Sequence, residues 1–324
     1  MITSYQTSGS GQQNTMPRSR YRFIVLSFLA IIIMLIFGAV VSSFAIIRCA
    51  PPWYTDIKYN TLTFHKFAIK NTSNNIVMIG DSALLMGIIP EIVAQETGHS
   101  MINLGLYGNS GLQGYYLMID HYLRYNTKPE YIIFYHAATT PYHFDEHKYE
   151  KTYTVAKYGS IKDILSGANP NLNDLINSAW RISWNSLKFI SRRYETNEMC
   201  QKEIIELTAT KGFQKNFFPE PLSNSYIFDS KQEKTFDTTF ISDFRTRYKS
   251  YGIRVLCCLA PMPKGDVSFD YFKKKYETVV DNTLEQYPNG YFTDKAHLTL
   301  SGAEYNSKRF ALFLKQRIQT DETR

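Results

Sequence analysis

A run of 25 residues that carries no charge and no proline, Phe23–Ile47, is the feature that most constrains how this chain can fold. As an α-helix it would be about 37 Å long, enough to cross the ~30 Å hydrocarbon core of a bilayer with some tilt. A buried core helix is a weaker alternative, because helices of soluble proteins are seldom apolar on every side. A cleavable signal peptide is the stronger alternative, with Ser43-Phe44-Ala45 as its cleavage site, although its apolar region usually spans only about 7–15 residues.

The charges that flank this run predict its orientation. Three arginines and no acidic residue precede it, at positions 18, 20 and 22, whereas one arginine and one lysine follow it, at positions 48 and 58. Because cytoplasmic flanks carry the excess of Lys and Arg, we expect a cytoplasmic N-terminus. The sequence therefore predicts a single-pass membrane protein with a disordered cytoplasmic tail over 1–22, a transmembrane helix over 23–47, a juxtamembrane linker over 48–73 and a periplasmic or extracellular domain over 74–324.

The composition of the whole chain is that of a folded protein. It is 44% apolar and 20% charged, which excludes a disordered chain and a disulfide-stapled miniprotein. The net charge of +7 favours an acidic partner, but three of these charges belong to the arginines before the apolar run. Lys and Arg form no stripe interleaved with aromatic residues, so no nucleic-acid partner is predicted.

The four cysteines give little information about function. They stand at positions 49, 200, 257 and 258, without the spacing of a metal site. Cys257 and Cys258 are predicted to be buried thiols, because adjacent residues form a disulfide only with strain. A bridge between Cys49 and Cys200 remains open as an alternative in an oxidising compartment.

Short apolar runs alternate with amphipathic stretches along residues 74–324. The runs predict strands over 75–80, 100–106, 131–135 and 253–259, with a short one at 291–292. The amphipathic stretches predict helices over 82–97, 110–125, 269–284 and 301–319, with a further helix face over 240–251. This alternation predicts an α/β fold: a three-layer sandwich with a mainly parallel sheet, preceded by one transmembrane helix.

The alternation stops over residues 141–235, which we interpret as an insertion or lid over the strand ends. One amphipathic helix is predicted there over 171–194, with Trp180 and Trp184 on its apolar face. Its basic residues allow contact with anionic membrane lipid, but packing on the core is the favoured interpretation. His143 and His147 have a spacing compatible with a metal, but no third ligand accompanies them, so no metal site is predicted.

The tripeptide Gly80-Asp81-Ser82 stands at a predicted strand-to-helix junction. A serine at this place is held at the carboxyl edge of the sheet, and the N–H groups of the helix behind it can stabilise an oxyanion. Ser82 could also serve only as a helix N-cap. The tripeptide is short enough to occur by chance, so it needs a second element.

That second element is Asp294-x-x-His297, just before the last predicted helix. A histidine there can reach the end of the first strand in a wound sheet, and Asp294 can fix its tautomer. Taken separately, Asp294 could be a turn residue and His297 a surface histidine. Together with Ser82, these residues predict a Ser-His-Asp hydrolytic site.

These motifs, with Asn103-Leu104-Gly105 after the second strand and Ser301-Gly302-Ala303 after the histidine, resemble the SGNH, or GDSL-like, hydrolase superfamily. The resemblance covers residues 74–136 and 236–318. It implies that Ser82 is the nucleophile, His297 the base and Asp294 the residue that orients it. It also implies that Gly105 and Ser82 donate backbone N–H groups to an oxyanion hole.

One block of the superfamily is absent. Where members usually carry G-x-N-D after the third strand, the chain has Tyr135-His136-Ala137-Ala138-Thr139. Asn109 is a candidate replacement for the missing amide donor. Asp81 and His136 are candidate lining residues of the site, and His136 has an equal alternative as a hydrogen-bonded buried histidine.

The missing block, the anchor and the insertion together resemble the membrane-anchored acyl-transfer branch, which includes proteins of lipoteichoic-acid D-alanylation and of alginate or peptidoglycan O-acetylation. This resemblance implies O-acyl transfer to an extracytoplasmic glycan beside a multi-pass membrane O-acyltransferase, without a cofactor. Two alternatives remain: an anchored carbohydrate esterase or lipase, and a non-catalytic scaffold of a polysaccharide modification complex.

Overall fold

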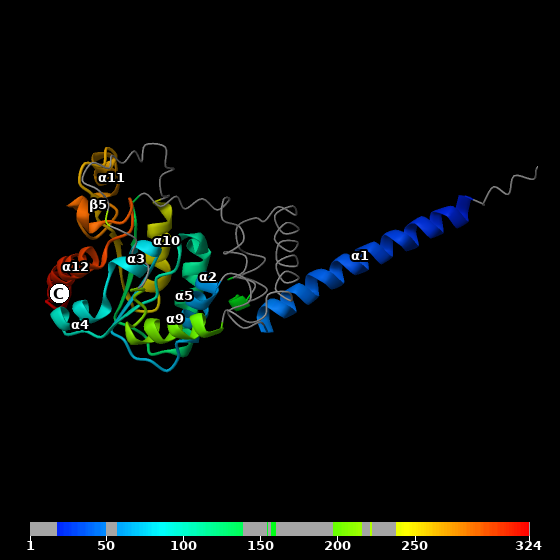
Figure 1. Cartoon of the computed structure of the whole chain (residues 1–324), viewed down its shortest axis with the longest axis horizontal. Helices are drawn as coiled ribbons and strands as arrows, with labels where there is room; N and C mark the ends of the chain where they lie inside the picture. The colour runs from blue at the N-terminus through cyan, green and yellow to red at the C-terminus, as the bar shows by residue number, and fades with distance from the viewer. Residues whose placement is uncertain are drawn as a thin grey trace, which may run out of the picture.

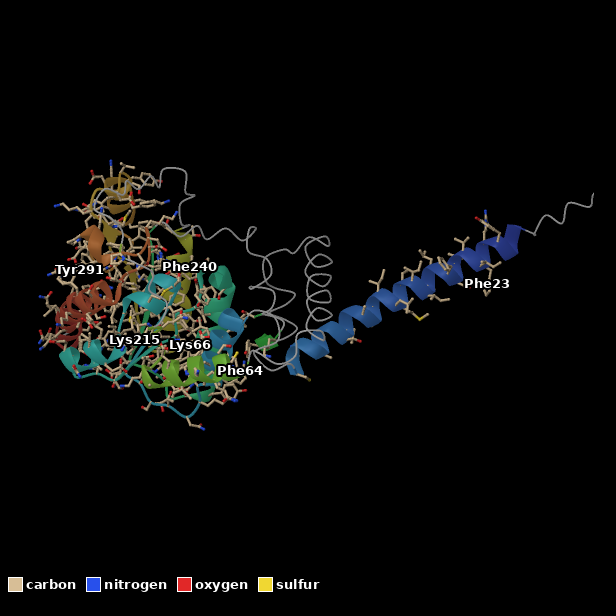
Figure 2. The ribbon with its side chains drawn as sticks, in the orientation of Figure 1. Phe23, Phe64, Lys66, Lys215, Phe240 and Tyr291 are labelled. Atoms are coloured by element: carbon tan, nitrogen blue, oxygen red, sulfur yellow. The ribbon has the colours of Figure 1, made fainter. Side chains whose placement is uncertain are left out.

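A computed structural model describes residues 18–49, 57–138, 154, 157–159, 197–215, 221 and 238–323. The first helix, α1 (Arg18–Cys49), contains a 19-residue window, Tyr21–Ala39, with a mean hydropathy of 2.6. None of this window is buried, and Figure 2 shows its side chains, Phe23 among them, standing clear of other elements. By length and composition, α1 can cross a membrane.

The domain is built on a four-stranded parallel sheet. Its strands are β1 (Ile76–Gly80), β2 (Met101–Asn103), β3 (Tyr131–His136) and β4 (Arg254–Leu259), in the order β2-β1-β3-β4. The four predicted long strands are thereby confirmed. Every residue of β1, β2 and β3 is buried, as expected of parallel strands covered on both faces. All four strands end at one edge of the sheet.

Helices cover both faces of this sheet, which confirms the predicted α/β sandwich (Figure 1). One face packs against α5 (Gly111–Tyr125), α10 (Thr239–Lys249) and α11 (Phe269–Tyr276). The other packs against α3 (Ser82–Gly87), α4 (Pro90–Thr97) and α12 (Leu300–Glu322). A small parallel pair, β5 (Met262–Pro263) and β6 (Gln286–Tyr287), follows β4.

Two predicted helices are shorter than expected. The helix over 82–97 is two helices, because Ile88 leaves the helical conformation and Pro90 begins α4. The helix over 269–284 ends at Tyr276, and its remainder forms turns. The strand at 291–292 is also wrong: Tyr291 belongs to a 3₁₀ turn, and Phe292 makes a single antiparallel bridge with Leu298.

The range predicted as a linker, 48–73, contains helix α2 (Ile57–Ala68), which packs against α9 (Asn197–Ala209) from the predicted insertion. Its buried face mixes Leu62 and Phe67 with threonines and a lysine, so the sequence lacks the apolar stripe of a core helix. The helix predicted over 171–194 lies outside the described residues, as do His143 and His147.

All four cysteines are free thiols, so the alternative bridge between Cys49 and Cys200 is not formed. Cys49 is exposed, whereas Cys200, Cys257 and Cys258 are buried. The Cys200 sulfur accepts a hydrogen bond from the Thr61 hydroxyl at 3.0 Å, which helps to join α9 to α2.

Candidate active site

Ser82 is the first residue of α3 and follows the sharp turn that ends β1. The turn needs a glycine at position 80, because a Cβ there would lie 1.6 Å from the carbonyl oxygen of Tyr135 on β3. Asp81 caps the helix: its Oδ1 accepts the N–H of Ala83 at 2.9 Å. These contacts hold Ser82 at the carboxyl edge of the sheet with its side chain partly exposed.

His297 and Asp294 lie in the loop between the 3₁₀ turn η3 (Asn289–Tyr291) and α12. Asp294 Oδ1 accepts the backbone N–H groups of Ala296 and His297, each at 2.8 Å. The N–H of Thr293 donates to the carbonyl of His297 at 2.9 Å and closes the loop. This aspartate-centred turn fixes the backbone from which the imidazole projects.

A continuous chain of hydrogen bonds joins the three predicted residues. Asp294 Oδ2 lies 2.6 Å from His297 Nδ1, and His297 Nε2 lies 2.7 Å from Ser82 Oγ. An ionised carboxylate can only accept, so Nδ1 carries the proton and Nε2 is left to accept the serine O–H. In this arrangement an imidazole can take the proton of a serine.

Asp294 is held in its ionised form. Burial raises the pKa of this carboxyl, but the hydrogen bond and charge of His297, with the N–H groups of Ala296 and His297, lower the pKa below its ordinary value overall. The carboxylate therefore stays charged at neutral pH and can stabilise an imidazolium on His297.

Two buried side chains of α12 tie it to the elements that follow Ser82. Asn306 Nδ2 donates to the carbonyl of Gly87, the last residue of α3, at 2.8 Å. Ser307 Oγ accepts the N–H of Ile89 at 2.8 Å. Because the His297 loop leads directly into α12, these bonds fix the imidazole relative to the nucleophile candidate.

The predicted oxyanion donors have different surroundings. No group in the described part of the chain accepts the N–H of Ser82. The N–H of Gly105 donates to the Asn103 side chain (Oδ1) at 2.8 Å. The amide of Asn103 in turn donates to the carbonyls of Leu84 and Ile88, at 2.9 and 3.1 Å. Asn103 thus fixes the Gly105 loop to α3, and an oxyanion would have to share or replace the bond that Gly105 makes.

The other predicted site residues are Asp81, His136 and Asn109. Asp81 and His136 are 1% and 0% exposed, so neither reaches the protein surface. Asp81 Oδ2 accepts the N–H of Ala137 at 3.1 Å, and His136 Nδ1 donates to the carbonyl of Ala137 at 2.9 Å. Burial lowers the pKa of His136 against the opposing effects of Asp81 and Ala137. Asn109 lies in the 3₁₀ turn η2 (Gly108–Ser110), and its side chain is outside the described part of the structure.

Lys66 is a residue near the site that the sequence gives no reason to select. Its fully buried ammonium group donates to the carbonyls of Asn103, at the end of β2, and of Gly212, after α9, the second bond at 2.7 Å. Burial lowers the pKa of Lys66 well below its ordinary value. Lys66 therefore connects the helix nearest α1 in sequence to the loop that carries Gly105.

Among the described residues, no group of three or more His, Cys, Asp or Glu side chains could hold a metal ion.

Comparison with known proteins adds little to this geometry. The chain matches no family model and no curated protein. Among solved structures it is similar to one described as "The structure of a putative platelet activating factor from Streptococcus pneumonia", with 16% sequence identity over 80% of this chain and 92% of that chain. The TM-score is 0.29, so this likeness carries no argument about fold or function.

Proposed function

We propose that the chain is a membrane-anchored serine acyl-transfer enzyme that moves an acyl group, most simply O-acetyl, onto a cell-surface or exported glycan. The observation that carries this proposal is the chain of hydrogen bonds of 2.6 and 2.7 Å from Asp294 through His297 to Ser82. The His297 side chain is 22% exposed and Ser82 is partly exposed, so a substrate can approach both.

The geometry supports a two-step reaction. Ser82 Oγ attacks the acyl carbonyl while its proton passes to His297 Nε2. The N–H of Ser82 stabilises the resulting oxyanion, and the N–H of Gly105 joins it by sharing or exchanging its bond to Asn103 Oδ1. The oxyanion collapses, the donor's leaving group takes the proton from Nε2, and acyl-Ser82 remains. A sugar hydroxyl then gives its proton to Nε2 and attacks acyl-Ser82. When this second intermediate collapses, the acyl group stays on the sugar and Ser82 Oγ leaves with the proton from Nε2, which restores the serine and the neutral imidazole.

The partners belong to the same proposal. The acyl donor is a multi-pass membrane O-acyltransferase. Helix α1 anchors the domain beside this partner, on the extracytoplasmic side of the bilayer where the glycan lies. Without such a donor and acceptor, water can replace the sugar hydroxyl, and the same residues would act as an anchored esterase.

The test compares Ser82→Ala with Ser301→Ala in cells that make the full chain. Ser301 is an exposed serine near the site whose hydroxyl lies 3.1 Å from that of Thr299, outside the Asp294–His297–Ser82 chain of bonds. We expect Ser82→Ala to reduce glycan O-acylation to the level of cells that lack the protein, and to reduce hydrolysis of a nitrophenyl ester by about 10³-fold or more. Ser301→Ala should leave both unchanged.

Two results would reject the transfer reaction. Full glycan acylation with Ser82→Ala but lost ester hydrolysis would assign an anchored esterase. If neither activity changed, the chain would be a scaffold rather than an enzyme.

A further inference from the structure

Strand β4 is an edge strand of the sheet in the described part of the chain. Its even-numbered residues face β3, as the bonds at the two ends of the pair show. The N–H of Arg254 donates to the carbonyl of Glu130, just before β3, at 3.0 Å, and the N–H of Ala260, just after β4, donates to the carbonyl of His136 at 2.8 Å. In a parallel pair, the residues between the bonded ones direct both their N–H and their C=O groups away from the neighbouring strand. The odd-numbered residues of β4 therefore direct their N–H and C=O groups away from the sheet.

The carboxyl-terminal half of this free edge is already covered. Asp281 Oδ2 accepts the N–H of Cys257 at 2.8 Å, and the Asp281 N–H donates to the Cys257 carbonyl at 2.7 Å. Asn282 bonds both backbone groups of Leu259, at 2.8 and 2.9 Å. By contrast, the N–H and C=O of Val255 have no partner among the described residues. Among the described residues, Val255 is thus the one odd-numbered residue of β4 whose backbone groups are free, and the amino-terminal half of the edge can pair with a further strand there.

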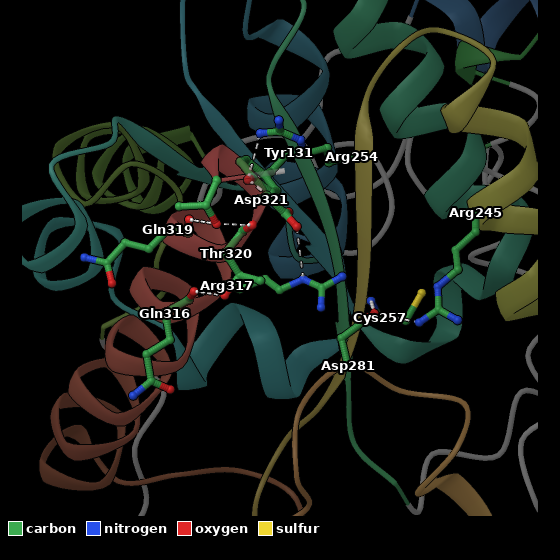
Figure 3. Close-up of polar contacts among 11 residues, drawn as sticks. Tyr131, Arg245, Arg254, Cys257, Asp281, Gln316, Arg317, Gln319, Thr320 and Asp321 are labelled. Atoms are coloured by element: carbon green, nitrogen blue, oxygen red, sulfur yellow. Dashed lines mark hydrogen bonds and ion pairs between the residues drawn. The ribbon is translucent and has the colours of Figure 1, made fainter.

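A cleft of about 490 Å³ lies along this open half. We call it the β4 cleft and define it by its lining residues, Arg245, Lys249, Ile253, Arg254, Val255, Leu256, Arg317 and Asp321. Figure 3 shows Arg245 on one side of β4 and Arg317 with Asp321 on the other. Four of the lining residues are cationic and one is acidic, so an anionic occupant is favoured.

The cationic groups keep N–H donors for an occupant. Arg245 contacts Asp281 through one terminal nitrogen at 2.6 Å, and Arg254 donates one N–H to the Tyr131 hydroxyl at 3.0 Å. Arg317 Nε lies 3.7 Å from Asp321 Oδ1, too far for a hydrogen bond. A guanidinium has five N–H groups, so each arginine can still bind a carboxylate.

We propose that the β4 cleft binds an extended acidic polypeptide segment as a fifth strand of the sheet. Such a segment accepts from the Val255 N–H and donates to its C=O through amide groups at the spacing of a strand, whereas a phosphate or a uronic acid has no amide N–H. Side chains of the added strand alternate between the two faces of the sheet. Adjacent acidic residues would therefore reach Arg245 and Lys249 of α10 on one face and Arg317 of α12 on the other.

The test uses the full chain in detergent micelles and a fluorescein-labelled peptide of four valines and four glutamates, with the glutamates in adjacent pairs. Fluorescence anisotropy measures its affinity against a matched peptide with lysines in place of the glutamates. We expect the glutamate peptide to bind at least tenfold more tightly. Methylation of its two central amide nitrogens should weaken binding at least tenfold, because methylation removes the backbone donors without changing charge.

The matching protein variant is Lys249→Glu with Arg317→Glu. This double variant should lower the affinity for the glutamate peptide at least tenfold. Lys315→Glu reverses an exposed charge on α12 outside the β4 cleft and should change that affinity less than twofold. Thermal unfolding checks that both variants fold. If the double variant does not fold, the comparison of the peptides on the unaltered chain still tests the proposal.

Three results would overturn the proposal. They are equal binding of the glutamate and lysine peptides, unchanged binding after amide methylation, and an oligogalacturonate that binds as tightly as the glutamate peptide. The last two would assign the β4 cleft to anions in general rather than to strand addition.

Discussion

His65 and Lys66 are adjacent titratable residues of α2, and both are buried although neither contacts a carboxylate in the described residues. His65 Nε2 lies 3.1 Å from the Thr208 hydroxyl of α9. Burial, followed by the charge of Lys66, lowers the pKa of His65 from 6.5 to about 3. The folded protein therefore keeps His65 neutral at pH values where the unfolded chain protonates it.

This difference predicts acid sensitivity of the fold. Between pH 6.5 and about 3 the unfolded state binds one proton more than the folded state at His65, so stability falls as the pH falls. From pH 6.5 to 4.5 the loss through this group is about 2 kcal/mol. Urea unfolding of His65→Gln should show a correspondingly smaller loss over this range.

His99→Gln is the matched control, because His99 is only partly buried and contacts Thr97 at the end of α4. It should retain the pH dependence of the unaltered chain. If His65→Gln also retained it in full, the assignment of the acid sensitivity to His65 would be wrong.

At the scale of elements, the turn after α9 depends on a close approach to the end of β2. Gly212 has φ +96°, and a Cβ there would lie 2.1 Å from the Asn103 carbonyl oxygen and 2.3 Å from the Lys66 ammonium nitrogen. The same two groups are joined by the bond from Lys66 to Asn103. A larger residue would therefore separate α2, α9 and β2 where they meet.

Gly212→Ala should be much more destabilising than Gly98→Ala. Gly98 has φ +74°, but no heavy atom of the described residues, its two chain neighbours aside, lies within 4 Å of the place that an added methyl group would take. Alanine there therefore meets only backbone strain of about 1 kcal/mol. At Gly212 the same strain adds to a clash with backbone, and we expect a further loss of about 2 kcal/mol or more in free energy of unfolding. Equal losses in urea unfolding would contradict the packing described for this turn.

The strands were predictable because parallel strands buried on both faces are continuous apolar runs, as in Ile76–Gly80 and Tyr131–His136. The sequence also predicts one site from Ser82, Asp294 and His297, because serine, histidine and aspartate at these places can act together in acyl transfer. The structure places the three side chains within hydrogen-bond reach. Helix α2 was missed since its core positions are largely polar. The polar residues of α2 are buried because they bond to groups in α9 and at the end of β2, and these contacts cannot be inferred from the sequence of α2 itself.

For the whole molecule, the orientation of α1 decides which side of the membrane holds the domain. Cys49, at the end of α1, is exposed, while the other three cysteines are buried. A membrane-impermeant maleimide added to intact cells should therefore label the chain through Cys49 if the domain is extracytoplasmic, and Cys49→Ser should abolish labelling.

A second variant, Ser10→Cys with Cys49→Ser, tests the other side of the membrane. It moves the reactive thiol from the end of α1 to a position before the start of this helix. We expect it to be labelled only after the membrane is permeabilised. Labelling of Cys49 only in permeabilised cells would place the domain in the cytoplasm and exclude an extracytoplasmic glycan as acceptor.

The proposed chemistry depends most on Ser82 being a nucleophile activated by His297. The most direct measurement treats the full chain in detergent with a fluorophosphonate and locates the adduct by tandem mass spectrometry. We expect one adduct, on Ser82, formed at least about 10²-fold more slowly in His297→Gln. An unlabelled Ser82, or equal labelling in the two chains, would contradict it.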